Sequence, residues 1–250
     1  MKEDKLYNNI QKALEDLPNN YSILEEQIDI EIQMKYFEFS KTIRDKDIAE
    51  ACFEEREQLF DDGVEEERKK EILAAIAVYN DVKAYRTLEK FVEESAGELR
   101  HWGVLALQEN RMLMHSSLLD EQQVFISTGL GGKGKKLRYF VVFLGNQPNE
   151  MLNDTQQKLL KNELVFELKK HDGEFESMDF MEGFSSAQLM LPLSANIKQV
   201  FQNVIDECNQ YGGFLSEDII VTNVKVLSRG EIIQLIHQRN NDGQNELEKE

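Results

Sequence analysis

The chain has 250 residues, and its 47 acidic residues outnumber its 29 lysines and arginines, which gives a formal net charge of −18. A chain this acidic is repelled by the phosphates of nucleic acids and by anionic membrane surfaces, so we expect neither as a partner. A hydrophobic content of 41%, with 3 prolines and 14 glycines, is typical of a globular protein with a packed core.

The N-terminal sequence and the cysteines indicate the compartment. The residues after Met1 contain no apolar segment of the kind found in signal peptides, and no apolar run reaches the length of about 18 residues that a membrane span needs. Cys52 and Cys208 lie far apart, each among apolar residues at helical spacing, which predicts two buried free thiols. Together these features predict a protein of the reducing cytoplasm.

Residues 1–118 are expected to form an all-α domain. Up to residue 115 the chain contains three glycines and one proline, and its apolar residues recur at helical spacing. Residues 67–76 can be laid over 98–107, and residues 47–51 over 81–85, at offsets of 31 and 34 residues. Self-similarity at such a period is typical of stacked helical hairpins.

Within this half, residues 47–115 resemble HEAT-like repeats. Small and apolar residues fill one helix at 72–77, Asp81 stands at a turn, and Arg100 precedes the next helix. The resemblance implies a curved scaffold for protein contacts. Two enzyme groups of this architecture do not fit: the alkylpurine DNA glycosylases need a basic groove, whereas residues 1–120 sum to −12, and the deoxyhypusine hydroxylases bind iron through His-Glu dipeptides, which the sequence does not contain.

Residues 122–238 are expected to form a second domain in which strands alternate with helices. From Arg138 the expected order is β-α-β-β-α-β, which resembles a ferredoxin-like α+β sandwich, so the predicted fold class of the chain is α+β. Residues 239–250 form a polar tail that we expect to be disordered. The expected strands are 124–128 (an added strand), 137–144, 175–180, 187–193 and 219–227. The expected helices are 155–170, 197–211 and 232–238, the last capped by Ser228 and Glu231.

A glycine-rich stretch at 129–138, which we call the glycine loop, holds the most basic part of the sequence, since residues 131–140 carry +4. It nearly matches a phosphate-binding P-loop, but Lys136 stands where a Ser or Thr would hold magnesium, and a strand is expected to follow, so we exclude nucleotide hydrolysis. Three interpretations stay open: an anion-binding concavity, a β-hairpin turn, and a surface that docks on the acidic half. The candidate anion-binding residues are Gly131, Gly132, Lys133, Gly134, Lys135, Lys136 and Arg138.

No other motif predicts catalysis or metal binding. Glu98 and His101 have metal-ligand spacing on a helix, but no second pair of this kind exists, and Glu98 is expected to form a capping box with Ser95. We therefore predict no metal and no cofactor. The function that the sequence favours is a non-enzymatic interaction or regulatory protein that binds a protein partner or self-associates. The alternative is a small-anion binding protein or enzyme that uses the glycine loop.

Overall fold

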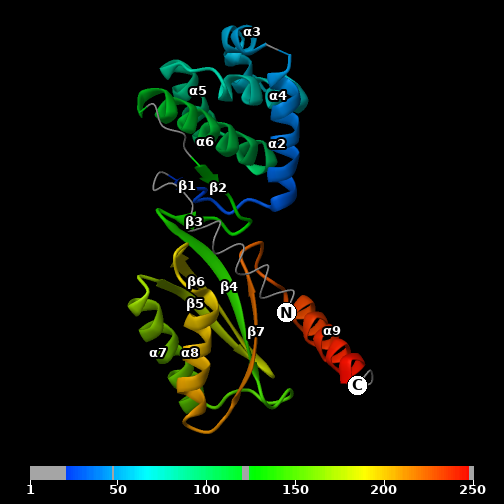
Figure 1. The fold of residues 1–250 in the computed structure, drawn as a ribbon. Helices are drawn as coiled ribbons and strands as arrows, with labels where there is room; N and C mark the ends of the chain where they lie inside the picture. The colour runs from blue at the N-terminus through cyan, green and yellow to red at the C-terminus, as the bar shows by residue number, and fades with distance from the viewer. Residues whose placement is uncertain (1–20, 47, 120–123, 248–250) are drawn as a thin grey trace. The chain divides into compact units, whose positions relative to one another are not determined.

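The computed structural model describes residues 21–46, 48–119 and 124–247, and the chain divides into two compact units, one ending at Lys135 and the other beginning at Lys136 (Figure 1). The first unit is mainly helical, and the second combines an antiparallel sheet with helices, which confirms the α+β class. None of the helices in the described ranges is long and apolar enough to cross a membrane.

The described residues of the first unit form four long helices, two short helical segments and three short strands. Two of its longer helices begin where an aspartate side chain accepts a hydrogen bond from a free backbone amide. Asp29 accepts from the amide of Glu31, and Asp81 accepts from the amide of Lys83 at 2.6 Å. The elements are β1 (Tyr21–Ile23), α2 (Ile30–Arg44), α3 (Ala49–Glu54), the 3-10 helix η1 (Arg56–Phe60), α4 (Glu66–Ala77), α5 (Val82–Glu94), α6 (Gly97–Leu119), β2 (Val124–Ile126) and β3 (Gly132–Lys133).

The helices of this unit share one hydrophobic core, and the predicted HEAT-like array is therefore wrong. In a solenoid each hairpin contacts only its neighbours along the chain, whereas here α2 contacts both α4 and α6. Trp102 of α6 lies edge-on to two aromatic rings of α2, Tyr36 at 5.5 Å and Phe39 at 5.4 Å between ring centroids. Such contacts close the unit around a single centre, so the weak repeat in the sequence reflects similar helix faces and not a stacked array.

The expected capping box between Ser95 and Glu98 does not form. The hydroxyl of Ser95 is buried without a hydrogen-bond partner, and the carboxylate of Glu98 pairs with Lys70 at 3.2 Å. Gly97 begins α6 with φ of +65°, a backbone conformation that glycine adopts without the steric penalty of a side chain. The chain therefore enters α6 through a glycine turn.

A two-stranded sheet in the first unit corrects two expectations. The segment up to residue 115 was expected to be all helix, but β1 is a strand, and β2, expected as an added strand of the second half, pairs with it in parallel. The pairing joins Tyr21 to Val124 and Ile23 to Ile126. The buried amide of Gln33 donates to the carbonyl of Thr128 at 3.1 Å, so the chain beyond β2 also packs against α2.

The second unit has the expected order β-α-β-β-α-β, followed by a final helix. Its four long strands pair antiparallel in the spatial order β7-β4-β6-β5. Helices α7 and α8 pack side by side, and the ring of Phe143 on β4 meets Phe201 on α8 at 6.0 Å (Figure 1). The elements are β4 (Lys136–Gly145), α7 (Asp154–Lys170), β5 (Glu174–Met181), β6 (Phe184–Pro192), α8 (Ile197–Asn209), β7 (Leu215–Thr222) and α9 (Arg229–Leu247).

Two predictions about this unit have clear outcomes. Ser228 and Glu231 cap α9 as expected, since the Ser228 amide donates to the Glu231 carboxylate at 2.8 Å and the Glu231 amide donates to the Ser228 hydroxyl at 3.3 Å. The helix does not end at Gln238 but continues to Leu247, so the polar segment from residue 239 is helical as far as that residue. Residues 248–250 lie outside the described ranges.

The cysteine prediction is confirmed, because Cys52 and Cys208 are both free and buried. Burial raises the pKa of the Cys208 thiol to about 12, with the nearby carboxylates of Glu163 and Glu207 acting in the same direction. The thiol therefore stays protonated at neutral pH and is a poor nucleophile.

Glu167 on α7 is a buried carboxylate with several hydrogen-bond donors. It accepts from the ammonium of Lys170 at 2.7 Å and from the amide of Asn203 on α8 at 2.6 Å. Burial raises the pKa of this carboxyl, but the hydrogen bonds outweigh burial and hold the pKa below its ordinary value of 4.5.

We expect the stabilising effect of Glu167 to disappear in acid. The folded carboxyl has the lower pKa, so the unfolded chain binds more protons, and the contribution is present above the unfolded pKa and lost as the pH falls through the folded pKa. At pH 7 Glu167→Gln is expected to lower the free energy of unfolding by about 1 to 2 kcal/mol. Urea unfolding followed by circular dichroism at pH 7 and pH 3 measures this difference. If Glu167→Gln lowers the free energy of unfolding by the same amount at pH 7 and at pH 3, the ionised Glu167 carboxylate is not the source of the stabilisation.

Candidate functional site

A cavity of about 290 Å³ in the helical unit has cationic side chains at half of its lining positions, and we call it the basic pocket. One wall comes from η1 and the other from α5. Among the lining residues a single one, Glu57, carries a carboxylate. The residues that define the pocket chemically are Arg56, Glu57, Phe60, Lys83, Arg86 and Lys90.

The sequence of α5 explains why three of these cations lie together. Lys83, Arg86 and Lys90 follow one another at spacings of three and four residues, which places them on one face of a helix. The opposite face is apolar, and Ala84, Leu88 and Phe91 are buried in the core. Because the apolar face fixes the rotation of α5, the cationic face is directed outward.

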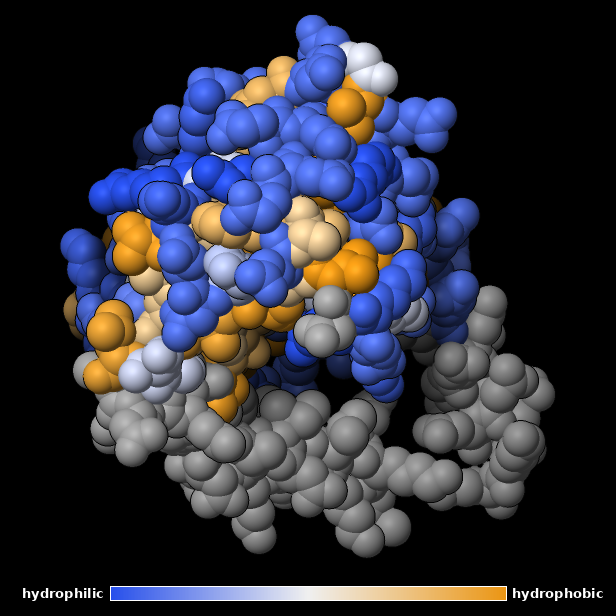
Figure 2. All heavy atoms as spheres, turned by 90° about the horizontal axis from the view of Figure 1, so that it is seen from above, coloured by the Kyte–Doolittle hydropathy of each residue, from blue (hydrophilic) through white to orange (hydrophobic). Residues whose placement is uncertain are grey.

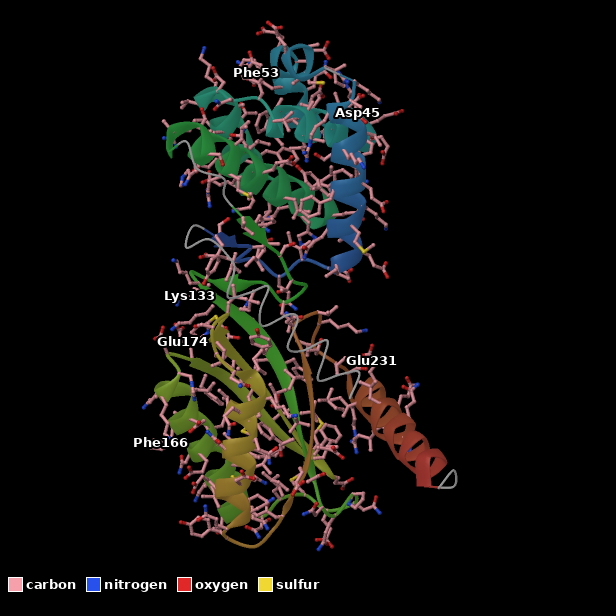
Figure 3. All side chains as sticks on the ribbon, in the orientation of Figure 1. Asp45, Phe53, Lys133, Phe166, Glu174 and Glu231 are labelled. Carbon is pink, nitrogen blue, oxygen red and sulfur yellow. The ribbon has the colours of Figure 1, made fainter. Side chains whose placement is uncertain are left out.

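Two aromatic rings hold cations at the edges of the pocket. The guanidinium of Arg56 lies 4.4 Å from the ring centroid of Phe53, which is labelled in Figure 3, and Arg56 also donates to the Phe53 carbonyl at 2.7 Å. The ammonium of Lys90 lies 4.2 Å from the ring centroid of Phe60. Cation–π contacts position these groups and leave their charge intact.

Nearby carboxylates pair only weakly with the pocket cations. Arg86 pairs with Glu89 at 2.7 Å, and the Arg86 side chain is 70% exposed; Lys90 and Glu94 are 3.9 Å apart with both side chains more than half exposed. Exposed ion pairs of this kind contribute about 0 to 1 kcal/mol, so an anionic ligand can compete for the cations.

Figure 2 shows hydrophilic side chains over most of the coloured surface seen from above, with hydrophobic side chains gathered among them.

A cavity of about 440 Å³ in the second unit has no such bias of charge. It combines Glu182 and Asp218 with Arg229 and His237 around an apolar floor that includes Phe184. Arg229 and Glu182 lie 3.6 Å apart. Within the described part of the chain, no group of three or more His, Cys, Asp or Glu side chains is arranged to hold a metal ion.

The glycines of the glycine loop have structural roles. Gly131 has φ of +66°, and a side-chain carbon at this position would lie 2.7 Å from the carbonyl oxygens of both Glu25 and Glu26. The amide of Gly134 donates to the carboxylate of Glu25 at 3.0 Å. The P-loop was excluded because a strand was expected after the loop, and β4 is that strand.

Of the seven predicted anion-binding residues, five lie at the end of the first unit and two lie on β4. Lys136 pairs with Glu174 at 3.0 Å and with Asp172 at 3.3 Å, and the pKa of Lys136 is raised chiefly by its hydrogen bond with Glu174. Arg138 makes two hydrogen bonds to Glu176, at 2.7 and 2.8 Å. The other five predicted residues, Gly131, Gly132, Lys133, Gly134 and Lys135, belong to the first unit. An anion-binding role for the loop stays a prediction.

Sequence reasoning missed the basic pocket, although one signal for it was present. Residues 81–90 carry +1 inside the segment 1–120, which sums to −12. Arg56 could not be joined to this stretch from the sequence, because it lies on a separate element that only packing brings beside α5.

Comparisons with known proteins find similar solved structures, of which two are described here. No protein-family model matches the chain, and no curated protein does. One similar structure is a protein from Deinococcus radiodurans R1 that is assigned as a transposase, with 17% identity and a TM-score of 0.36 over 41% of this chain and 90% of that one. Another is a REP-associated tyrosine transposase bound to a REP hairpin, with 8% identity and a TM-score of 0.31 over 36% of this chain and 57% of that one.

These findings correct the family and function expected from the sequence. Both structures are described as transposases, which is neither of the resemblances expected from the sequence, HEAT-like α-solenoids and ferredoxin-like proteins. The predicted function, a non-enzymatic scaffold or a small-anion protein that uses the glycine loop, is not the function of either structure. One of these transposases is bound to a REP hairpin, which contrasts with the expectation of a protein partner or self-association without nucleic acid.

Proposed function

We propose that the chain binds single-stranded nucleic acid through the basic pocket. One observation carries the proposal: four cations, Arg56, Lys83, Arg86 and Lys90, line one cavity of about 290 Å³ with a single carboxylate-bearing residue among the lining. Phosphodiester groups are the ligands that such a cluster of guanidinium and ammonium groups favours.

The net charge of the chain weakens this interaction without preventing it. Charges farther away than about 8 Å are largely screened at physiological ionic strength, so the ligand experiences mainly the cations that it touches. Nucleic acid was excluded from the net charge of the chain. That net charge does not give the local charge at a cavity of this size. We therefore expect weak, strongly salt-dependent binding.

The aromatic component of the pocket favours a single strand over a duplex. Single-stranded nucleic acids bind where cations follow the backbone and aromatic rings meet the bases, and Phe60 lines the pocket beside Lys90.

The test is fluorescence anisotropy with a labelled oligothymidylate of about 15 nucleotides at low salt. We expect wild type to bind, and Lys83→Ala/Arg86→Ala/Lys90→Ala to bind at least tenfold more weakly. Each lost phosphate contact removes about 0.7 from the slope of log K against log salt, so the slope is expected to fall by about 2.

The matched control removes three exposed lysines elsewhere, in Lys35→Ala/Lys41→Ala/Lys158→Ala. It changes the net charge of the chain by the same amount and is expected to lower affinity less than threefold. Absence of binding by wild type, or equal losses in the two triple variants, would overturn the proposal.

Three further assignments are proposals of the same kind. We propose that the two compact units are the domains of the chain. The second unit, from β4 to β7, is proposed to form a two-layer βαββαβ sandwich. The two buried free thiols support a cytoplasmic location.

A further inference from the structure

A second cavity in the helical unit has a volume of about 490 Å³ and lies beside β1 and α6. Its cations are Arg111, near the end of α6, and Lys135, at the end of the unit. The ammonium of Lys135 lies 5.3 Å from the ring centroid of Tyr21, so this cavity, like the basic pocket, places a cation beside an aromatic ring.

Tyr85 on α5 connects the two cavities. Arg86, which lines the basic pocket, has its guanidinium carbon 6.0 Å from the ring centroid of Tyr85. Arg111, which lines the second cavity, lies at the same distance from that ring and is 3.4 Å from the Tyr85 hydroxyl. One cation from each cavity thus lies beside the ring of Tyr85, whose hydroxyl also donates to the Glu89 carboxylate at 3.4 Å.

We infer that the bound strand continues from the basic pocket past Tyr85 and Arg111 into the second cavity, where Arg111 and Lys135 contact phosphates and Tyr21 meets a base. This inference rests on the proposed function and adds a second binding subsite to it. With two subsites, the protein is expected to bind a strand of several nucleotides and not a mononucleotide. Alternating cations and aromatic rings are the arrangement that single-strand binding requires.

The carboxylates of the second cavity limit its affinity in a predictable way. Glu26 is neutralised by two hydrogen bonds from Arg100. Glu25 accepts a hydrogen bond from the amide of Gly134, which is uncharged, so its negative charge remains in the cavity and opposes a phosphate. Removing the charge of Glu25 is therefore expected to tighten binding of a strand long enough to reach it.

The experiment measures affinity for labelled oligothymidylates of 4, 8, 12 and 16 nucleotides at low salt. In Arg111→Gln/Lys135→Gln we expect the 12- and 16-mers to bind roughly tenfold more weakly, with the salt slope lower by about 1.4, and the 4-mer to be unchanged within twofold. Glu25→Gln is expected to bind the 12-mer severalfold more tightly than wild type.

Two controls separate the outcomes. Lys35→Gln/Lys41→Gln loses the same charge on the exposed surface of α2 and is expected to keep the wild-type length dependence. The fluorescence of Trp102 during urea unfolding verifies that each variant folds. If wild type binds no oligonucleotide, the proposed function fails. If binding depends on the basic pocket but Arg111→Gln/Lys135→Gln keeps the wild-type length dependence and salt slope, only the second subsite is overturned.

Discussion

Asn110→Asp is expected to lower the free energy of unfolding of the helical unit by about 3 to 5 kcal/mol at pH 7. Asn110 on α6 is fully buried, and its side-chain nitrogen lies 2.9 to 3.2 Å from the carbonyl oxygens of Ile76, Ala77 and Tyr79 at the end of α4. The Ile76 carbonyl also accepts from the amide of Tyr79 at 3.1 Å, and the Tyr79 carbonyl also accepts from the amide of Asp81 at 2.9 Å, so the Asn110 amide adds a further donor at the end of α4. A carboxylate at residue 110 would direct negative oxygens at all three carbonyl groups.

The destabilisation by Asn110→Asp is expected to depend on pH. The buried carboxyl lacks a compensating cation, so its folded pKa rises above its unfolded value, and stability is recovered as the pH falls below the folded pKa. Asn110→Leu is the matched control. It removes the same hydrogen bonds without adding a charge and is expected to lower the free energy of unfolding by about 1 to 3 kcal/mol at any pH.

Urea unfolding followed by the fluorescence of Trp102 is the measurement, because this is the single tryptophan of the chain and it is buried in the same unit. Equal effects of Asn110→Asp and Asn110→Leu at pH 7 would show that the Asn110 amide does not cap α4.

Gly183→Ala is expected to destabilise the second unit by about 3 kcal/mol or more. Gly183 lies in the turn between β5 and β6 with φ of +82°, and a side-chain carbon there would clash with the carbonyl oxygen of Pro148. The close approach is held by two hydrogen bonds, from the Gly145 amide to the Gly183 carbonyl at 2.8 Å and from the Gly183 amide to the Glu150 carbonyl at 2.9 Å. Alanine would have to separate these segments.

Gly213→Ala is the control for Gly183→Ala. Gly213 also has a positive φ, +57°, but a side-chain carbon there would meet nothing within 4 Å, so we expect a loss of only about 1 kcal/mol from the backbone conformation. Hydrogen exchange measured by mass spectrometry on peptides from β4 and β6 reports the loss of stability in both variants. If hydrogen exchange accelerates equally in Gly183→Ala and Gly213→Ala, the clash with Pro148 does not explain the destabilisation by Gly183→Ala.

Local signals predicted most of the second unit. The apolar face of α8 and the alternation along β6 are properties of short segments, so the expected helix 197–211 corresponds to Ile197–Asn209 and the expected strand 187–193 to Phe184–Pro192. The Ser228 and Glu231 cap was predictable for the same reason, because both partners lie within one turn of a helix.

Predictions that needed contacts between distant segments were wrong. β1 has three residues and no strong strand pattern, and it is a strand because the backbone of 124–126 pairs with it. The similarity between 67–76 and 98–107 comes from two helices, α4 and α6, that present small apolar residues to one shared core. A degenerate repeat in the sequence could not distinguish that core from a stacked array.

The sequence by itself determined the α+β class, the order of the elements in the second unit, the free buried thiols and the exclusion of a P-loop, because each depends on residues close together in the chain. Only the tertiary structure decided where charge gathers. It paired Lys136 and Arg138 with the carboxylates of β5, and it brought Arg56 beside the cationic face of α5. The electrostatic potential at a site depends on distances in space, because opposite charges a few ångströms apart cancel. The sum of charges along the chain carries no information about those distances.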